Sequence, residues 1–268
     1  MTPQSQHSQT PPQTRPATQT THVGGLDTAV VTRKSLAEIM VHDCLLRRNT
    51  PALPKVVFSS NGQGVALAGF DENFSRTMRA ADIIHADGMS VVWASRLLTS
   101  KPLPERVATT DFFHDAARAA VENGLSFFIL GADENLNREA VIHIQAMYPG
   151  LKIVGRRNGY FKREEEPAIC QQIVQSGADV LWVALGKPLQ EEFCLRNRQN
   201  LNGVGWIKTC GGLYAFLTGK SRRAPQFVQD YGMEWIWRLG EDPLRLAKRY
   251  ILTNPYAIYR MIRYSRSS

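Results

Sequence analysis

The sequence predicts an α/β protein in which a largely parallel sheet is flanked by helices and followed by a basic, helical C-terminal appendage. Three observations support this fold class. Short apolar runs alternate repeatedly with helix-like stretches, which is typical of strands joined by crossover helices. Several of these runs end at a glycine. The alternation stops near Gly219, and the chain beyond it is rich in arginine and aromatic residues.

The strands and helices follow from the spacing of apolar residues. Short apolar runs indicate strands centred on residues 56–58, 83–84, 126–130, 152–154, 180–185 and 206–207. Helical spacing predicts helices in an amphipathic segment that ends at Met78 and at residues 111–123, 135–147 and 164–176. Beyond Gly219 the helical pattern is interrupted at Pro225, Pro243 and Pro255.

Loop-forming glycines follow several of the expected strands, at Gly88, Gly131, Gly155, Gly186 and Gly211-Gly212. Ligands of open α/β sheets bind beyond the carboxyl ends of the strands, so these loops are where we expect a site. Tight turns would need the same glycines, so the glycines indicate a location and not a chemistry. No dinucleotide fingerprint or P-loop follows a strand, and we therefore expect no cofactor.

We divide the chain into a disordered leader at residues 1–22, an α/β domain at residues 23–219 and the appendage at residues 220–268. The leader is rich in Gln, Thr, Ser and Pro and lacks the apolar core of a secretion signal. No run approaches the roughly 18 to 20 apolar residues of a membrane span. The four cysteines are scattered without metal-ligand spacing, which predicts free thiols in the cytoplasm and no metal site.

The appendage carries most of the positive charge. From Lys220 onward there are ten Lys or Arg and four Asp or Glu residues, a net charge of +6 against +8 for the whole chain. Aromatic residues such as Trp235, Trp237 and Tyr250 are interleaved with them. Cationic groups beside amphipathic rings suit an anionic surface, which could be a bilayer, a polyphosphate or a nucleic acid.

Asp87 follows an apolar run and precedes Gly88. A carboxylate there could act as a general base that takes a proton from a sugar or nucleoside hydroxyl. Asp-Gly is also well suited to a helix N-cap or an Asx-turn, and spacing alone favours that interpretation. We expect His85 to be a strand histidine with satisfied hydrogen bonds rather than a catalyst.

Two other segments offer polar side chains near strand ends. Ser59 and Asn61 could hydrogen-bond substrate hydroxyls or could cap a helix. Arg106, just before a predicted helix, could bind a phosphate bidentately or form an ion pair with Glu105 or Asp111.

The loop after Gly186 places three further polar side chains over the sheet edge. Lys187 has the reach for a phosphate. Gln190 could bind a hydroxyl or a uracil edge. Glu191 could hold a ribose or cap a helix.

The last expected strand is followed by Gly211 and Gly212. Paired glycines could let backbone N–H groups approach a diphosphate, which Arg222 and Arg223 could neutralise. A turn followed by a solvated basic loop would look the same in the sequence.

Together these segments resemble the WecG/TagA/CpsF family of bacterial glycosyltransferases. The most specific elements are G-x-P-x-Q-E at residues 186–191 and E-W-x-x-R-L at residues 234–239. The other matching stretches are residues 59–61, 86–88, 105–107 with Asp111, 150–161, 223–225, 232–235 and 243–245. The resemblance follows the family's order and covers roughly residues 25–250.

The resemblance implies a Rossmann-like, inverting, metal-independent enzyme. It would move a sugar from a UDP-sugar donor onto a sugar linked to undecaprenyl diphosphate. Asp87, in the A-D-G element, would be the general base that deprotonates the acceptor hydroxyl. Matching positions place Ser59, Asn61, Arg106 and Gln190 in the substrate pocket.

The same resemblance gives the appendage two roles. It would hold the protein on the anionic inner face of the cell membrane, and it would close arginines over the diphosphates. The matching positions are Arg238 and Arg245, with Lys248 or Arg249 as a third, and we add Arg223. The sequence has no D-x-D element, which agrees with metal independence, because clustered arginines could supply the positive charge for the leaving UDP.

The sequence leaves the transferred sugar and the oligomeric state open. Family members transfer N-acetylmannosamine, its uronic acid or glucose. We favour glucose, as in exopolysaccharide synthesis, because no additional cation near Asp87 clearly awaits a uronate. The alternative is a basic nucleic-acid-binding protein, in which Asp87, Gln190 and Glu191 would have no evident role. We therefore expect no nucleic-acid partner. A soluble nucleotide-sugar enzyme such as an epimerase would need the dinucleotide fingerprint that the chain lacks.

Overall fold

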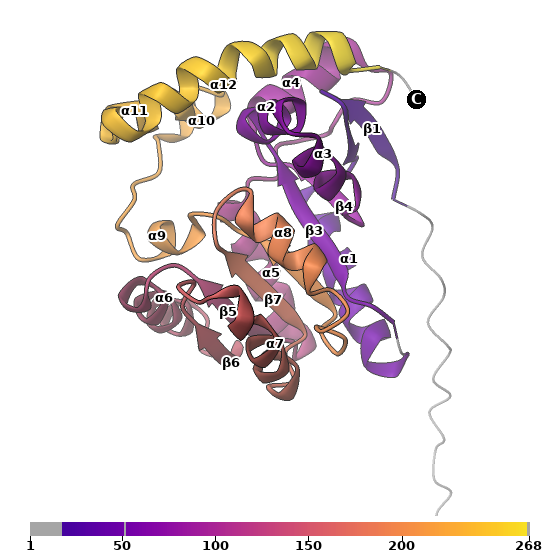
Figure 1. Ribbon diagram of the computed structural model, residues 1–268, viewed down its shortest axis with the longest axis vertical. Coiled ribbons are helices and arrows are strands. Elements are labelled where there is room, and N and C mark those ends of the chain that lie inside the picture. The colour runs from indigo at the N-terminus through magenta and orange to yellow at the C-terminus, as the bar shows by residue number, and fades with distance from the viewer. Residues whose placement is uncertain (1–17, 51, 267–268) are drawn as a thin grey trace, which may run out of the picture.

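The computed structural model describes residues 18–50 and 52–266. At its centre is a parallel six-stranded sheet with the strand order β4-β3-β8-β7-β5-β6 (Figure 1). The strands are β3 (Lys55–Ser60), β4 (Ile83–Ala86), β5 (Ser126–Gly131), β6 (Lys152–Arg157), β7 (Val180–Ala184) and β8 (Trp206–Thr209). All six apolar runs form strands, and the predicted Rossmann-like α/β fold is confirmed.

Helices cover both faces of this sheet. One face packs against α1 (Arg33–Asn49), α5 (Thr109–Asn123), α6 (Glu134–Met147) and α9 (Leu213–Leu217). The other packs against α3 (Glu72–Arg79), α7 (Glu166–Gln175), which follows the short η1 (Arg163–Glu165), and α8 (Leu189–Arg196). Because both faces are covered, the strands read as nearly continuous apolar runs, which made them visible in the sequence.

The amphipathic segment that ends at Met78 forms two helices, α2 (Gly62–Phe70) and α3. The break falls at Asp71, whose carboxylate accepts hydrogen bonds from the backbone N–H groups of Asn73 and Phe74. An aspartate at this position starts a new helix because it satisfies N–H groups that have no partner within the helix.

A third apolar cluster joins the two ends of the described chain. It contains residues of β1 (Thr20–Val23), α2, α4 (Met89–Leu98) and α12 (Pro243–Tyr264). Ala257 and Met261 of α12 are buried in this cluster together with Val65 and Val91. The long α12 therefore lies across α2 and α4 (Figure 1) and forms part of the core.

The structure corrects the end of the predicted leader. Residues 20–22, which we had assigned to it, belong to β1, which pairs with β2 (Leu26–Ala29) in an antiparallel hairpin. The end of α12 secures the hairpin, where the Gly25 N–H donates to the Tyr264 carbonyl at 3.0 Å. The rest of the predicted leader, residues 1–17, lies outside the described residues.

The boundary proposed at Gly219 lies between α9 and two short helices, α10 (Gln226–Asp230) and α11 (Glu234–Glu241). No residue of α10 or α11 is buried. The second half of α12, by contrast, packs into the α/β domain. The segment 220–268 is thus loosely packed at its start and firmly packed at its end. Within the described residues, no helix is long and apolar enough to cross a membrane.

Candidate active site

The candidate residues gather at the carboxyl edge of β3, β4, β7 and β8. The chain order changes direction between the adjacent strands β3 and β8, because β4 lies on one side of them and β7, β5 and β6 lie on the other. In open α/β sheets, ligands bind in the crevice that such a reversal creates. Gly88, Gly186 and Gly211 lie at this edge of the sheet, whereas Gly155 lies inside β6 and follows no strand.

Asp87 stands directly after β4, and both of its carboxylate oxygens are engaged. Oδ1 accepts a hydrogen bond at 2.7 Å from the backbone N–H of Thr109, at the start of α5. Oδ2 accepts one at 3.3 Å from the side-chain amide of Asn61. Asp87 does not cap α4, the helix that follows it, since the N-cap of α4 is Gly88. The carboxylate instead satisfies the first N–H of a helix that starts much later in the chain.

The surroundings keep Asp87 ionised. Its burial alone would raise its pKa. The hydrogen bond from Thr109 and the influence of His85, Arg106 and Lys208 outweigh that effect and lower the pKa of Asp87 to about 2. The carboxylate is therefore available as a proton acceptor at neutral pH.

Asn61 both caps a helix and orients Asp87. Its Oδ1 accepts the backbone N–H of Gly64 at 3.0 Å, which caps α2, and its amide nitrogen donates to Asp87. Gly88 packs against it so closely that a Cβ at this position would lie 2.9 Å from the Cβ of Asn61. A glycine after Asp87 is thus needed for the close approach of β3 and β4 that brings Asn61 to the carboxylate.

A buried ion pair between Lys187 and Glu191 connects the ends of the strands at the candidate site. Glu191 is completely buried, and its Oε1 accepts hydrogen bonds from Lys187 Nζ at 2.7 Å and from Gln190 Nε2 at 2.9 Å. Lys187 also donates to the carbonyl of Ser59 at 3.0 Å, and Gln190 Oε1 accepts the N–H of Gly211 at 3.1 Å. These contacts join the ends of β3, β7 and β8.

This ion pair and its hydrogen bonds change the roles that the sequence suggested for Lys187, Gln190 and Glu191. The side chain of Glu191 is enclosed and so is not placed to hold a ribose. Lys187 is turned inward with 9% of its side chain exposed. Gln190 is buried, and both ends of its amide are engaged, because Nε2 donates to Glu191 and Oε1 accepts from Gly211. A buried ion pair needs such additional hydrogen bonds to offset the desolvation of its charges, which explains why the polar groups point inward.

The loop after β8 is open on its outer side. Gly211 has a φ of +51°, and a Cβ added at Gly211 or Gly212 would meet no atom within 4 Å. The N–H of Gly211 is already bonded to Gln190, so an approaching ligand would meet the outer surface of this loop.

Arg106 joins the α/β domain to α11. One of its nitrogens lies 3.0 Å from a carboxylate oxygen of Glu234, and the other oxygen of Glu234 pairs with Arg238 at 2.9 Å. Arg106 pairs with neither Glu105 nor Asp111, the two partners that the sequence suggested. Glu105 instead accepts the backbone N–H of residue 33 at the start of α1.

Arg223 lies in the same group of side chains. It forms an ion pair with Asp111 at 3.0 Å and donates to Gln229, which also accepts from Arg106 at 3.4 Å. Arg223 and Arg238 both lie over the ring of Phe216, at 6.0 and 4.9 Å from its centre. We call Arg106, Arg223 and Arg238 the arginine cluster.

The basic residues of α12 are placed differently. Arg249 donates to the hydroxyl of Tyr250 at 3.0 Å. Lys248 lines a mainly apolar hollow of about 610 Å³ together with Pro243, Leu244, Ala247, Ile251 and Leu252. The side chain of Arg245 lies outside the described part of the structure.

Sequence reasoning missed a buried polar layer beside Asp87. Lys208 of β8 is completely buried, and its ammonium group donates to the carbonyl of Thr209. Burial lowers the pKa of Lys208 to about 8. His85 is also completely buried, and the backbone of Val107 acts on it as a hydrogen-bond partner that raises its pKa. Burial, followed by the charge of Lys208, outweighs this effect and lowers the pKa of His85 well below the usual value. That His85 is a satisfied strand histidine stays a prediction.

Hydroxyl groups at the same edge of the sheet are unpaired. The side-chain oxygens of Ser60, Thr109 and Thr209 are buried without a partner. Native proteins leave few buried polar atoms unsatisfied, and those that occur call for a specific explanation. Their concentration around the carboxyl ends of β3, β4 and β8 fits a site that receives a polar ligand or ordered water.

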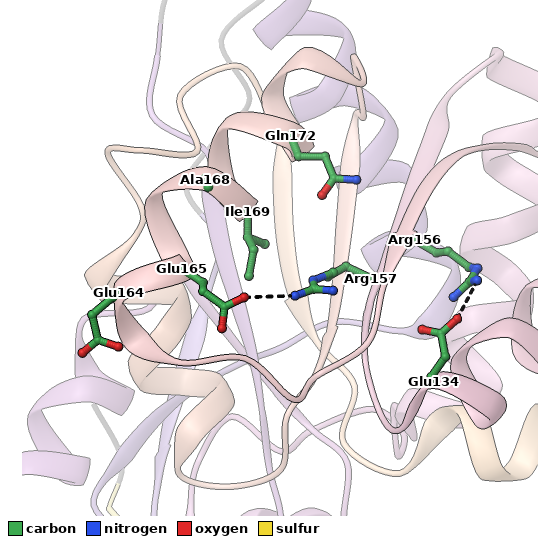
Figure 2. Close-up of a pocket in the computed structure, with 8 residues that line it drawn as sticks. All are labelled: Glu134, Arg156, Arg157, Glu164, Glu165, Ala168, Ile169 and Gln172. Carbon is green, nitrogen blue, oxygen red and sulfur yellow. Dashed lines mark hydrogen bonds and ion pairs between the residues drawn. The ribbon is translucent and has the colours of Figure 1, made fainter.

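The described residues include no group of three or more His, Cys, Asp or Glu side chains that could hold a metal ion. A separate hollow of about 690 Å³ lies near the edge strand β6 and α7 (Figure 2). In it Arg156 pairs with Glu134 at 2.7 Å and Arg157 with Glu165 at 3.3 Å. None of the candidate site residues lines this hollow, so the surroundings of Asp87 remain the candidate site.

This sheet topology defines a Rossmann-like α/β protein, with the ionised carboxylate of Asp87 after β4 and guanidinium groups alongside as its candidate site. The model of the Glycosyl transferase WecG/TagA/CpsF family matches residues 21–268, and the chain belongs to this family. It is therefore a glycosyltransferase of the type that acts in polysaccharide synthesis, with a sugar donor and a sugar acceptor as substrates.

Proposed function

We propose that this enzyme transfers a sugar, with inversion and without a metal ion, from a UDP-sugar to a sugar linked to undecaprenyl diphosphate. The observation that supports this most directly is the connection between Asp87 and the arginine cluster. Arg106 is close enough to lower the pKa of Asp87, and Glu234 joins Arg106 to Arg238. A proton acceptor thus lies beside groups that can neutralise diphosphates.

In the proposed reaction the acceptor hydroxyl attacks the anomeric carbon from the face opposite the UDP. Asp87 takes the hydroxyl proton, a new C–O bond forms, and the bond to the phosphate oxygen breaks with its electron pair left on UDP. Oδ1 is held by the 2.7 Å hydrogen bond from Thr109. We therefore assign the proton to Oδ2, where the hydrogen bond from Asn61 is longer, at 3.3 Å.

The low pKa of Asp87 also has a consequence for its strength as a base. A carboxylate with a pKa of about 2 binds protons weakly. Burial acts in the opposite direction and raises the pKa of this group. Asp87 is only partly buried, so an acceptor sugar bound beside it would displace water and increase its burial, and we expect its pKa to rise when the substrate is bound.

The arginine cluster would neutralise the diphosphate groups. Arg223 and Arg238 each pair with one carboxylate, but their side chains remain 25% and 38% exposed, so part of each guanidinium group can still meet a phosphate. Guanidinium groups match phosphate oxygens bidentately, which suits them to a leaving UDP. We also propose Ser59, Gly211 and Gly212 as substrate contacts. The roles of Arg245, Lys248 and Arg249 at the diphosphates rest on the family resemblance alone.

We further infer that α12 holds the enzyme on the anionic inner face of the membrane. Leu244 and Ile251 are 95% and 71% exposed, so they do not dock on the α/β domain. They belong to an exposed apolar stripe made of Leu244, Ile251, Leu252, Ile258, Tyr259 and Ile262. The helix has 22 residues, so it is roughly 33 Å long. A contiguous apolar face beside basic side chains is typical of helices that lie in a membrane surface.

Among the possible sugars we keep glucose as the first to test. A uronic acid would need a free cation near Asp87. Lys208 is completely buried with its ammonium group on the Thr209 carbonyl, and Arg106 is paired with Glu234. Lys208 is therefore enclosed away from a bound sugar, and Arg106 belongs to the cluster that this proposal assigns to the diphosphates.

The proposal is tested by incubating the full-length protein with a panel of UDP-sugars, a synthetic undecaprenyl-diphosphate-linked sugar and anionic vesicles. We expect transfer from one UDP-sugar, an inverted anomeric configuration by NMR, and unchanged rates with EDTA. Failure with every UDP-sugar, retention of configuration, or loss of activity with EDTA would each contradict a part of the proposal.

A further inference from the structure

Glu234 is the first residue of α11, and its carboxylate contacts arginines from two different parts of the chain. One oxygen lies 3.0 Å from Arg106 of the α/β domain, and the other lies 2.9 Å from Arg238 of α11 itself. The side chains of Arg106 and Glu234 are only 13% and 14% exposed. A partly buried carboxylate between two guanidinium groups attracts both of them, and so links the α/β domain to α11.

The rest of α11 offers little apolar packing that could hold it over the site. Neither α10 nor α11 has a buried residue, and Trp235, Ile236 and Trp237 are each more than one-third exposed. Trp235 packs edge-on against Tyr250 of α12, so one side of α11 is attached to that helix. The contacts of α10 and α11 with Arg106 are polar, through Glu234 and Gln229.

We propose that Glu234 is a positioning residue for the transfer reaction. Its carboxylate sets Arg238 of the appendage and Arg106, the neighbour of Asp87, in one rigid group. This inference rests on the proposed function. Without the carboxylate, α11 loses its ion pair to the α/β domain, and Arg238 is no longer fixed relative to the base. Displacements of about 1 Å in such groups can reduce rates by about a hundredfold.

The matched variants are Glu234→Gln and Glu241→Gln in the full-length protein. Both remove one carboxylate from the same helix, but Glu241 is exposed. Hydrogen–deuterium exchange of residues 226–241 reports whether α10 and α11 stay in place, and steady-state kinetics report the transfer. Circular dichroism and thermal melting confirm that the variants are folded.

We expect Glu234→Gln to exchange faster over residues 226–241 and to lose about 10- to 100-fold in kcat, whereas Glu241→Gln behaves as the wild type. Glu234→Asp, which keeps the charge on a shorter side chain, should recover part of the lost turnover. If Glu234 had a purely structural role, both Glu234 variants would lose stability, but their turnover would not follow this order.

Unchanged exchange in Glu234→Gln would overturn the inference whatever the activity, because α11 would then be held by something else. Faster exchange with wild-type turnover would also overturn it, because the position of α11 would not matter to the reaction. Inactivity of the wild-type protein with every UDP-sugar is a different failure. It would refute the proposed function, while the exchange experiment would still decide whether Glu234 holds α11.

Discussion

Asp87 owes its position to groups far from it in the sequence. The Thr109 N–H fixes one oxygen, Asn61 approaches the other, and Gly88 leaves the space that Asn61 needs. Its location at a strand end could be inferred from an apolar run that ends in Asp-Gly. The hydrogen bond to the start of α5 could not, because nothing local in the sequence indicates which helix will begin next to β4.

Asp87→Asn removes the negative charge of this side chain but keeps its size and shape. The amide oxygen of asparagine can still accept the Thr109 N–H, but the amide group cannot take a proton from an acceptor hydroxyl. We expect turnover to fall by about a hundredfold or more, the low end for removal of a general base, with UDP binding nearly intact. Steady-state kinetics and calorimetric titration with UDP measure the two effects. Near-normal turnover would exclude Asp87 from the role.

Lys208 shows what sequence reasoning missed and which signal was present. It lies on β8 two residues after Trp206 and two before Cys210, which directly follows the strand, and residues at this spacing share a face of the sheet. Lysine is almost never fully buried without a partner, so a lysine at an alternating position in an apolar strand points to a special environment. Nothing comparable in the sequence indicated that Arg106 pairs with Glu234, because this ion pair depends on how residues 220–268 fold back onto the α/β domain.

The buried ammonium group makes stability depend on pH. The pKa of Lys208 is lowered from 10.5 to about 8 in the folded protein. Between these values the unfolded chain holds a proton that the folded one has lost, so this contribution to the free energy of unfolding rises with pH. Below pH 8 the charge is buried in the folded state and the stabilisation is absent. The total change is about 3 kcal/mol at 1.36 kcal/mol per pKa unit.

Urea denaturation of the wild type and Lys208→Met between pH 7 and 11 tests this linkage. The difference between the two curves removes the contributions of other titrating groups. We expect the stability of the wild type relative to the variant to increase by about 3 kcal/mol from roughly pH 8 to pH 10.5. Parallel curves would show that Lys208 titrates at its ordinary pKa.

Among the helices and strands, the sheet was the easiest part to predict and the N-terminal hairpin the hardest. Strands buried on both faces have a strong apolar signature, which is why β3 to β8 were found. The β1–β2 hairpin has strands of four residues, and it is covered by α12 from the other end of the chain. The hairpin is stabilised by its contact with α12, which the local spacing of apolar residues does not reveal.

The apolar stripe on α12 predicts how the protein meets lipid. Inserting a half-exposed isoleucine into the membrane surface should contribute about 1 to 2 kcal/mol. The double variant Ile251→Glu with Ile258→Glu should therefore bind anionic vesicles at least about tenfold more weakly than the wild type. Flotation with vesicles that contain anionic lipid measures this partition.

Ile142→Glu is the matched control for that experiment. Ile142 on α6 is 58% exposed, the same fraction as Ile258, but it lies on the α/β domain away from α12. It should float like the wild type. Equal loss in the control would mean that added negative charge, and not the apolar stripe, explains the effect. Unchanged flotation of the double variant would exclude α12 as the membrane contact.

In the whole molecule, the last helix connects the proposed membrane contact, the candidate active site and the hydrophobic core. α12 presents its apolar stripe outward, supports α11 through Trp235 and Tyr250, and buries Ala257 and Met261 in the cluster shared by β1, α2 and α4. The composition of residues 220–268 indicated a basic helical appendage. It did not reveal that the end of this segment completes a hydrophobic cluster, because the partners of Ala257 and Met261 lie near the opposite end of the chain.

Removal of residues 220–268 should consequently lower stability as well as activity. The truncated chain loses the buried Ala257 and Met261 and exposes Val23 and Val65, which they cover. Loss of one buried methionine side chain typically costs 2 to 5 kcal/mol, so we expect the melting temperature to fall by roughly 10 °C. Full-length Met261→Ala should show part of this decrease, whereas Met147→Ala, at an exposed position on α6, should show little. Melting of the truncated protein at the wild-type temperature would instead mean that residues 220–268 form a separable appendage beginning near Gly219.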